Sequence, residues 1–409
     1  NNPGDVEQAI LAYQAFLSSA QSVYSVWYDN AKYYLGLATY DQATGITDPA
    51  MAIAKFDQAI VLLKNFTIDA NLAASSFVDD ALYYTGRAYH EKGVQELQVL
   101  SNSPVPNGTP SVNSSLVLAR TMYGSPALTA VAKPLADNAR YQIGKTYYDE
   151  AAFSQAAAEK LTTNSTTDVA NRQSLYNFTL DRLLSALPEF QTVLDPLVAY
   201  SSNNSDDNAQ FHTARIIHRM AVIPVDNRVE YLKTKTASIE TVVNSRVVPK
   251  QILVLDGIVF ETARAEYNEF IAVNAKFETS SLVNSVYYEV GRTYSAEGYA
   301  DLTNRKSLYE SALLAFANVL KSDTKSVRVD DSAFEMAMIY HYAQQCNPNR
   351  NLPMQMPGDE EMAWGYMIDY MSINNITDKQ LSDAKDLDYG SPHDCLSPLG
   401  VMSFVDAIK

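Results

Sequence analysis

The stretch Asp79–Tyr89, with the sequence DDALYYTGRAY, contains the pattern that decides the fold of this chain. Two acidic residues open it, and a glycine follows seven positions after the first of them. An Asp at a helix start can cap exposed N–H groups and is favoured by the positive end of the helix dipole. Gly86 lets a second helix approach closely, and Tyr89 lies on the same helix face. The stretch therefore predicts the beginning of an amphipathic helix that packs tightly against a neighbour.

The same pattern recurs along the chain in one internal register. Each copy has a polar pair at its front and a glycine or alanine seven positions later. The copies begin at Asp29, Asp79, Asp137, Asp207, Asn284 and Asp330 and reach Gly36, Gly86, Gly144, Ala214, Gly291 and Ala337. Such repetition is typical of stacked helical hairpins, which work by offering surface rather than by catalysing a reaction. We therefore expect an all-α protein, an irregular solenoid of helical hairpins.

With the residues that follow them, these copies resemble the tetratricopeptide repeat. The family spacing is matched by Gly86, Tyr89 and Gly93, and again by Gly291, Tyr294 and Gly298; second-helix signatures follow at Ala52, Phe56 and Ala59 and at Ala312, Phe316 and Val319. The Asp-Asn-Ala opening is similar to tetratricopeptide proteins of the bacterial envelope, such as the lipoprotein of outer-membrane β-barrel assembly and the TolA-binding coordinator. The resemblance implies an adaptor or a scaffold.

The resemblance is incomplete, because the copies are irregularly spaced whereas the family period is about 34 residues. Long loops or extra helices must separate most copies. Hydrophobic periodicity predicts a first helix from Asp5 and further helices over 22–41, 48–65, 76–100, 135–160, 168–200, 207–222, 225–245, 250–276, 280–300, 304–321, 329–345 and 358–373. Prolines and glycines interrupt residues 101–134, although Leu116–Ala119 indicates a short packed piece there.

From Cys346 onward Pro, Met, Gly and Asp replace the repeat. We therefore expect a helical repeat region over 1–345 and a loop-rich C-terminal cap over 346–409, which covers the last hairpin. Cys346 and Cys395 both fall in this cap. A disulfide between them would close a loop of about 50 residues and stabilise the fold by about 3–4 kcal/mol. Separate thiols, or a zinc site with His341 and His393 despite the absent finger spacing, are the alternatives.

The composition excludes several classes of protein. A net charge of −16 argues against nucleic acid, whose phosphates require clustered Lys and Arg. No apolar run reaches the ~18–20 residues of a membrane span. The chain opens Asn1-Asn2-Pro3-Gly4 without an apolar signal region, so an export signal has been removed or the protein is cytosolic. Only 19% of residues are charged and Asn, Ser and Thr are abundant, which favours an extracytoplasmic location.

The sequence contains no metalloprotease helix motif, Gly-rich phosphate loop or nucleophile elbow. We therefore expect no catalytic activity, no resident metal and no cofactor. Asn-x-Ser/Thr sequons mark candidate glycosylation sites at Asn65, Asn107, Asn113, Asn164, Asn177, Asn203 and Asn375. Chance gives about four such sequons, and an O-linked sugar on Ser114 or Ser115 is an alternative modification.

Two functions fit this sequence. The first helix carries an apolar stripe that makes self-association candidates of Val6, Ile10, Tyr13, Phe16 and Leu17, with Tyr24 and Trp27 beyond it. An uncovered end of a helical stack predicts a structural or assembly subunit that contacts its own copies or an envelope protein, including a glycosylated fibre. The alternative is a monomeric envelope adaptor that binds a partner peptide in the solenoid groove. A groove binder should show a coherent polar or basic set at fixed repeat positions, and the inserts hide any such set.

Overall fold

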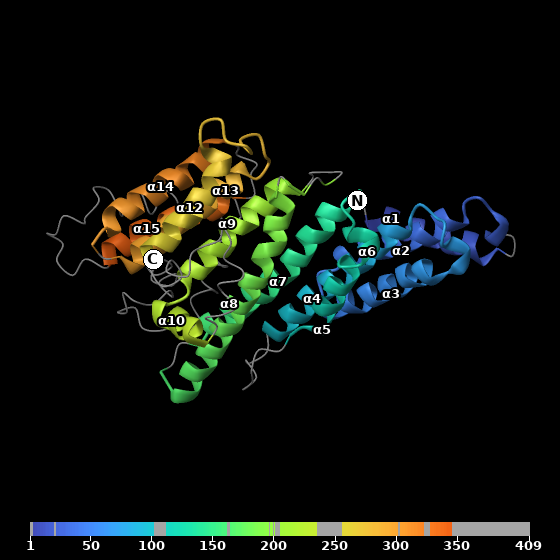
Figure 1. Cartoon of the computed structure of the whole chain (residues 1–409), viewed down its shortest axis with the longest axis horizontal. Helices are drawn as coiled ribbons and strands as arrows, with labels where there is room; N and C mark the ends of the chain where they lie inside the picture. Colours follow the sequence, from blue (N-terminus) through green and yellow to red (C-terminus); the bar gives the residue numbers. More distant parts are fainter. Residues whose placement is uncertain are drawn as a thin grey trace. The chain divides into compact units, whose positions relative to one another are not determined.

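A computed structural model of the chain describes residues 3–19, 22–101, 112–161, 164–195, 197–198, 200, 205–234, 256–301, 303–322 and 328–345 (Figure 1). Within these ranges the protein contains fourteen α-helices, two short 3-10 helices and no strand. The predicted all-α fold class is therefore confirmed.

The helices divide into two compact units. Unit 1 comprises Asn1–Ile216 and Ile223–Val254, and unit 2 comprises Ile217–Val222 and Leu255–Lys409. This division differs from the predicted one between a repeat region over 1–345 and a cap over 346–409. The cap lies outside the described residues, as does the predicted helix over 358–373, so both stay predictions.

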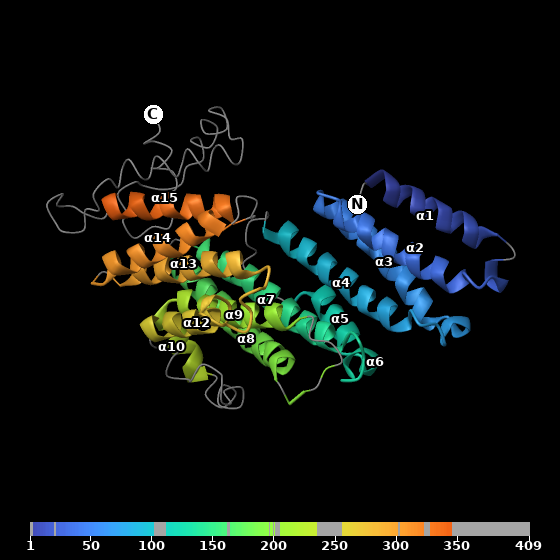
Figure 2. The same ribbon diagram turned by 90° about the horizontal axis from the view of Figure 1, so that it is seen from above.

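Unit 1 begins with four helices that lie side by side, each packed against the next (Figure 2). They are α1 (Pro3–Ser18), α2 (Tyr28–Thr44), α3 (Pro49–Ile68) and α4 (Val78–Ser101), with the 3-10 helices η1 (Ser22–Tyr24) and η2 (Ala70–Leu72) in the turns. The helix predicted to start at residue 22 begins only at Tyr28, because Ser22–Tyr24 forms η1. The core of these hairpins is rich in tyrosine and phenylalanine, including Tyr40, Phe56 and Phe66.

The second half of unit 1 is built around a long helical pair. Helix α5 (Ser114–Tyr123) packs against α4, and the short α6 (Pro126–Thr129) leads into α7 (Ala136–Glu159). Helix α8 (Thr166–Leu194) packs along α7, and α9 (Asp206–Val222) and α10 (Val225–Thr234) follow. The short packed piece predicted inside the break is confirmed, because Leu116 and Ala119 are fully buried in α5.

Unit 2 contains α12 (Asp256–Ile271), α13 (Val283–Ala300), α14 (Arg305–Ser322) and α15 (Val329–Gln345), together with the last residues of α9. Helix α13 packs against α12 and α14, and α14 packs against α15. Phe316 and Val319 of α14 are fully buried between Tyr288 of α13 and Met336 of α15.

The predicted close approach at the small residue of the repeat is confirmed at four glycines. An added Cβ would lie 2.5–2.8 Å from a large side chain on the next helix in each case. The pairs are Gly36 with Leu63, Gly86 with Tyr123, Gly144 with Phe190, and Gly291 with Phe316. A larger residue at any of these positions would push the two helices apart, because protein interiors are close-packed.

The front residue of each copy is not the N-cap of its helix, although Asp29 and Asp207 each accept a hydrogen bond from the backbone N–H of the next residue. The first helical hydrogen bond runs from Ala31 N to Trp27 O, and the other copies repeat it with Ala81 and Phe77, Ala139 and Leu135, Ala209 and Ser205, Val286 and Leu282, and Ser332 and Arg328. The polar pair therefore stands inside the first turn, where a carboxylate still meets the positive end of the dipole. The N-cap residues Trp27, Leu135, Ser205 and Leu282 make no side-chain cap hydrogen bond.

Candidate functional site

The front residues of the repeat bind the turn that leads into the next hairpin. Asp29 accepts a hydrogen bond from Ser75 Oγ at 2.9 Å, across the turn between α3 and α4. Asp79 pairs with Lys133 at 2.7 Å, in the approach to α7. Asn138 Oδ1 accepts a hydrogen bond from Ser205 Oγ at 2.7 Å, at the start of α9. In these three copies the polar pair thus ties its helix to the turn that leads into the next hairpin.

A second recurring arrangement joins an arginine to the tyrosine and glutamate that follow the glycine. In unit 1 the Arg120 guanidinium lies 4.2 Å from the Tyr147 ring centroid, and its Nη1 is 3.0 Å from Glu150 Oε2. In unit 2 Arg264 lies 4.2 Å from the ring of Tyr294 and 2.6 Å from Glu297 Oε2. The cation stacks on the ring face and neutralises a largely buried carboxylate.

Sequence reasoning missed this arrangement, although the sequence held part of the signal. Tyr147 and Tyr294 stand three positions after their glycines, and Glu150 and Glu297 stand six positions after them. The two arginines do not stand at a fixed distance in sequence from these residues. Only the folded structure therefore brings each arginine to its tyrosine and glutamate. The shared geometry shows that unit 1 and unit 2 each contain the same local Arg–Tyr–Glu arrangement.

The interior of unit 1 holds a histidine cluster. His90 Nε2 lies 2.8 Å from Asp149 Oδ2, and Lys145 also pairs with Asp149. Although burial opposes it, the charge of Lys145 and the hydrogen bond with His90 hold the pKa of Asp149 well below its usual range. His212 is enclosed by the rings of Tyr141, Tyr148, Phe190 and Phe211, at centroid distances of 5.1–5.8 Å.

The environment of His212 keeps its imidazole neutral. Burial, together with the nearby charges of Lys145 and Arg215, lowers the pKa of His212 to about 3. Its Nδ1 lies 3.0 Å from the carbonyl oxygen of Asn208, whereas its Nε2 is buried without a hydrogen-bond partner among the described residues. The four rings and His212 pack together in the core of unit 1.

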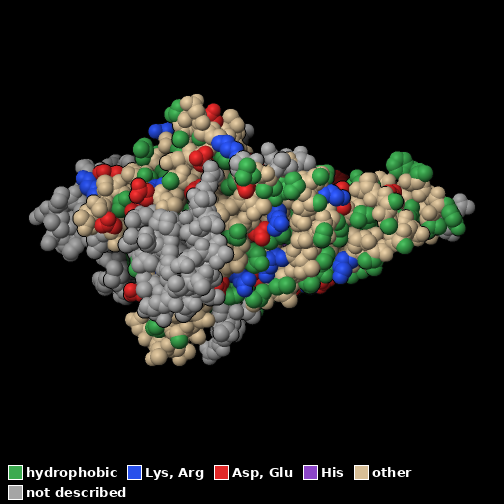
Figure 3. Space-filling view, in the orientation of Figure 1, with side chains coloured by type: hydrophobic (Ala, Val, Ile, Leu, Met, Phe, Trp, Pro, Cys, Tyr) green, Lys and Arg blue, Asp and Glu red, His purple; other side chains and the backbone are tan. Residues whose placement is uncertain are grey.

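The turn between α1 and α2 carries the most exposed aromatic side chains of the N-terminal hairpin. Tyr24 is 87% exposed, Val26 is 83% exposed and Trp27 is 63% exposed. Figure 3 shows hydrophobic side chains gathered at the end of unit 1 that carries this turn. Contiguous apolar residues at the surface mark sites of interaction with other molecules.

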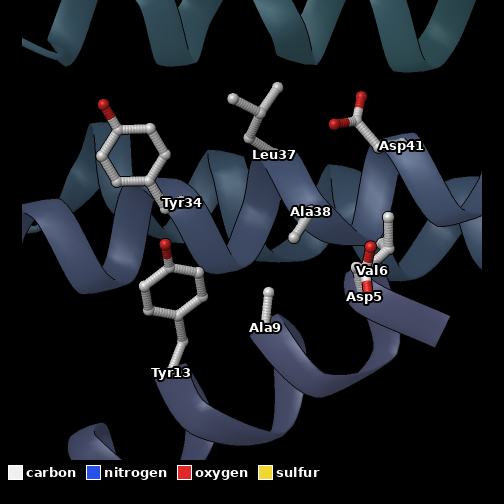
Figure 4. Close-up of a pocket in the computed structure, with 8 residues that line it drawn as sticks. All are labelled: Asp5, Val6, Ala9, Tyr13, Tyr34, Leu37, Ala38 and Asp41. Atoms are coloured by element: carbon white, nitrogen blue, oxygen red, sulfur yellow. The ribbon is translucent and has the colours of Figure 1, made fainter. Parts of the chain in front are cut away.

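A cavity of about 260 Å³ opens between α1 and α2 (Figure 4). Tyr13 and Tyr34 lie at one end, with nearly parallel rings whose centroids are 6.2 Å apart. The middle is apolar and is lined by Val6, Ala9, Leu37 and Ala38. Asp5 and Asp41 lie at the other end. The cavity therefore has an aromatic end, an apolar middle and an acidic end.

The two carboxylates of this cavity differ in their surroundings, because Asp5 is exposed and Asp41 is half-buried. No side chain in the described ranges donates a hydrogen bond to Asp5 or Asp41 or forms an ion pair with either. Burial raises the pKa of Asp41 above its ordinary value, and the positive charge of the amino terminus opposes this shift only in part.

The five self-association candidates lie on the side of α1 that packs against α2. Val6, Ile10, Tyr13, Phe16 and Leu17 are all half-buried, and two of them line the cavity. The freely exposed residues are instead the aromatic pair predicted beyond the stripe, Tyr24 and Trp27. The open apolar surface is thus the turn after α1 rather than the stripe itself.

The described sequons differ in accessibility. Asn65 and Asn164 are exposed. Asn113 caps α5, since its Oδ1 accepts a hydrogen bond from Leu116 N while its Nδ2 donates one to Glu96. Asn177 Oδ1 accepts a hydrogen bond from Gln173 inside α8. Asn107, Asn203 and Asn375 lie outside the described residues.

The predicted cysteine chemistry also lies beyond the described ranges. Cys346, Cys395 and His393 fall outside them, and His341 lies in α15 without a described side chain. Among the residues that are described, no cluster of His, Cys, Asp and Glu could hold a metal ion. None of the helices in these ranges combines the length and apolar character that a bilayer span requires.

No protein-family model, no curated protein and no solved structure matches this chain.

Proposed function

We propose that this chain is a non-enzymatic, extracytoplasmic helical-repeat protein that acts through protein–protein contacts, as a self-associating structural or assembly subunit. The observation that carries the proposal is the exposed turn at Tyr24, Val26 and Trp27. Burying these side chains against a second copy would remove a large apolar area from water, at about 25 cal/mol per Å².

The tetratricopeptide resemblance belongs to the same proposal. It is supported by the four glycines that face large side chains and by the repeated Arg–Tyr–Glu arrangement. The extracytoplasmic location is supported by the composition and by the exposed sequons at Asn65 and Asn164. A glycosylated fibre is the assembly that these features favour, because a contact between unlike surfaces propagates unless its rotation closes a ring.

The test is the state of association of the purified chain. Light scattering at rising concentration should show a mass that grows beyond one copy, and electron microscopy of native material should show fibres or closed rings. A particle of one copy under both conditions would remove the structural-subunit function.

A second candidate function is a monomeric adaptor that binds a partner in a groove of the helical array. One observation favours it: the open cavity between α1 and α2, with its aromatic, apolar and acidic parts. An apolar wall beside an acidic end suits a side chain with an apolar stem and a polar head.

A further inference from the structure

The cavity between α1 and α2 distinguishes between classes of partner by its shape and charge. Its apolar middle, formed by Val6, Ala9, Leu37 and Ala38, is continuous with the carboxylates of Asp5 and Asp41. A lysine or arginine side chain has the matching order of parts, an aliphatic stem followed by a cationic head. The stacked pair Tyr13 and Tyr34 at the other end offers ring surface to an apolar neighbour on the same partner.

The electrostatics of the cavity favour a cationic occupant. No side chain in the described residues pairs with Asp5 or Asp41, and Asp41 has lost part of its hydration, which the positive charge of the amino terminus offsets only in part. A cationic head placed between them would replace that lost hydration with charge-assisted hydrogen bonds. An anionic or neutral occupant would leave both carboxylates uncompensated.

The charge of the whole chain argues for a different protein as the occupant. The chain has 47 acidic and 31 basic residues, so a second copy approaches the cavity against net repulsion. A free amine could reach the acidic end but would leave the tyrosine pair uncovered. A peptide segment engages both ends at once, because it carries a basic residue and an apolar neighbour on one backbone.

We propose that the cavity between α1 and α2 is a docking site for a basic, partly apolar segment of a partner protein, which places a lysine or arginine head between Asp5 and Asp41 and an apolar side chain on Tyr13 and Tyr34. This inference rests on the adaptor function above and is independent of self-association through the α1–α2 turn.

The test uses the full chain and a capped, fluorescein-labelled peptide of alternating Lys and Leu pairs, followed by fluorescence anisotropy. Its counterpart has Glu in place of Lys. Neutralising both cavity carboxylates, Asp5→Asn with Asp41→Asn, should weaken binding of the basic peptide about tenfold, the combined effect of two partly exposed ion pairs. The double variant Glu7→Gln with Glu278→Gln removes the same net charge outside the cavity and should leave affinity unchanged.

Four outcomes would overturn the inference. The basic peptide could bind both double variants equally, which would make its binding an effect of net charge. The acidic peptide could bind equally well, which would keep an adaptor cavity but remove its charge selection. Putrescine could displace the peptide at equal concentration, which would assign the cavity to a free amine. Finally, the cavity variant could lower the mass seen by light scattering, which would assign the cavity to contacts between copies.

Discussion

Single glycines set the distance between paired helices. At Gly291 an added Cβ would meet the Phe316 ring at 2.5 Å, and Phe316 is itself fully buried. Two effects oppose one another in a Gly→Ala change here. Alanine favours the helix by about 1 kcal/mol, whereas overpacking a tight core costs about 1–3 kcal/mol.

We predict that Gly291→Ala lowers the free energy of unfolding by up to about 2 kcal/mol, because overpacking against the buried ring of Phe316 outweighs the gain in helix propensity. Gly45→Ala is the matched control. The nearest atom to its added Cβ lies 3.6 Å away and its φ is −84°, so the change should stay within about 0.5 kcal/mol. Urea unfolding followed by circular dichroism measures both. Equal stability of the two variants would show that the pair does not fix the helix spacing.

His212 makes the stability of unit 1 depend on pH. Its pKa is about 3 in the folded protein, against about 6.5 when unfolded, so the unfolded chain binds the extra proton. Stability is therefore full above pH 6.5 and falls as the pH decreases toward 3. We predict that, between pH 7 and pH 5, the free energy of unfolding of the native chain falls by about 1–2 kcal/mol more than that of His212→Phe. Parallel stability curves for the two proteins would contradict this prediction.

The described sequons should differ in whether their asparagine carries a glycan. We predict glycan at Asn65 and Asn164 and unmodified asparagine at Asn113 and Asn177, because the amides of the latter two are held by Glu96 and Gln173. Glycopeptide mass spectrometry of protein from its natural source is the measurement. Glycan on Asn177 would contradict the prediction, since its side-chain oxygen would then not be held by Gln173.

At the scale of helices, buried and exposed ion pairs carry different weight. Glu150 is 2% exposed and is shared between Arg120 of α5 and Arg182 of α8. Lys133 and Asp79 pair at the surface, with side-chain exposures of 42% and 30%. The first contact joins α5 and α8 to Glu150 of α7, and the second joins α4 to the turn before α7, but only the first leaves buried charge behind when it is broken.

We predict that Glu150→Gln destabilises the protein by about 3–5 kcal/mol, because two largely buried guanidinium groups lose their carboxylate. Asp79→Asn, the control, should cost less than about 1 kcal/mol, as exposed pairs do. Chemical unfolding at low and high salt separates the two, since only the exposed pair is screened. Similar costs for both variants would mean that Glu150 is as well hydrated as Asp79.

The helices themselves could be predicted from the sequence because their periodicity is local. The ranges expected for α7, α14 and α15 lie within one residue of those observed. The turn at Ser22–Tyr24 was missed because its residues continue an apolar pattern without a proline or glycine. Contacts such as Arg120 with Tyr147 could not be predicted, since they depend on which helices meet in space.

The candidate site was predictable only in part. The sequence placed Tyr24 and Trp27 beyond the first helix, where no neighbouring segment was expected to bury them. The cavity was not foreseen, since it needs Asp5 and Asp41 from two helices to come together in antiparallel order.

At the scale of the whole molecule, the proposed association of copies should take place through the α1–α2 turn. A chain with a net charge of −16 repels its own copies, so an apolar contact must outweigh that repulsion. Raising the salt concentration screens the repulsion and should strengthen association.

Sedimentation velocity over a concentration series is the most direct measurement of this claim. It compares the native chain with the double variant Tyr24→Ser and Trp27→Ser, and with Val273→Ser, which removes a 92% exposed apolar side chain from unit 2. We predict that the native chain and the Val273→Ser control associate with rising concentration, whereas the turn variant stays at the mass of one copy. Unchanged association in the turn variant, or a native chain that never exceeds one copy, would contradict self-association through this turn.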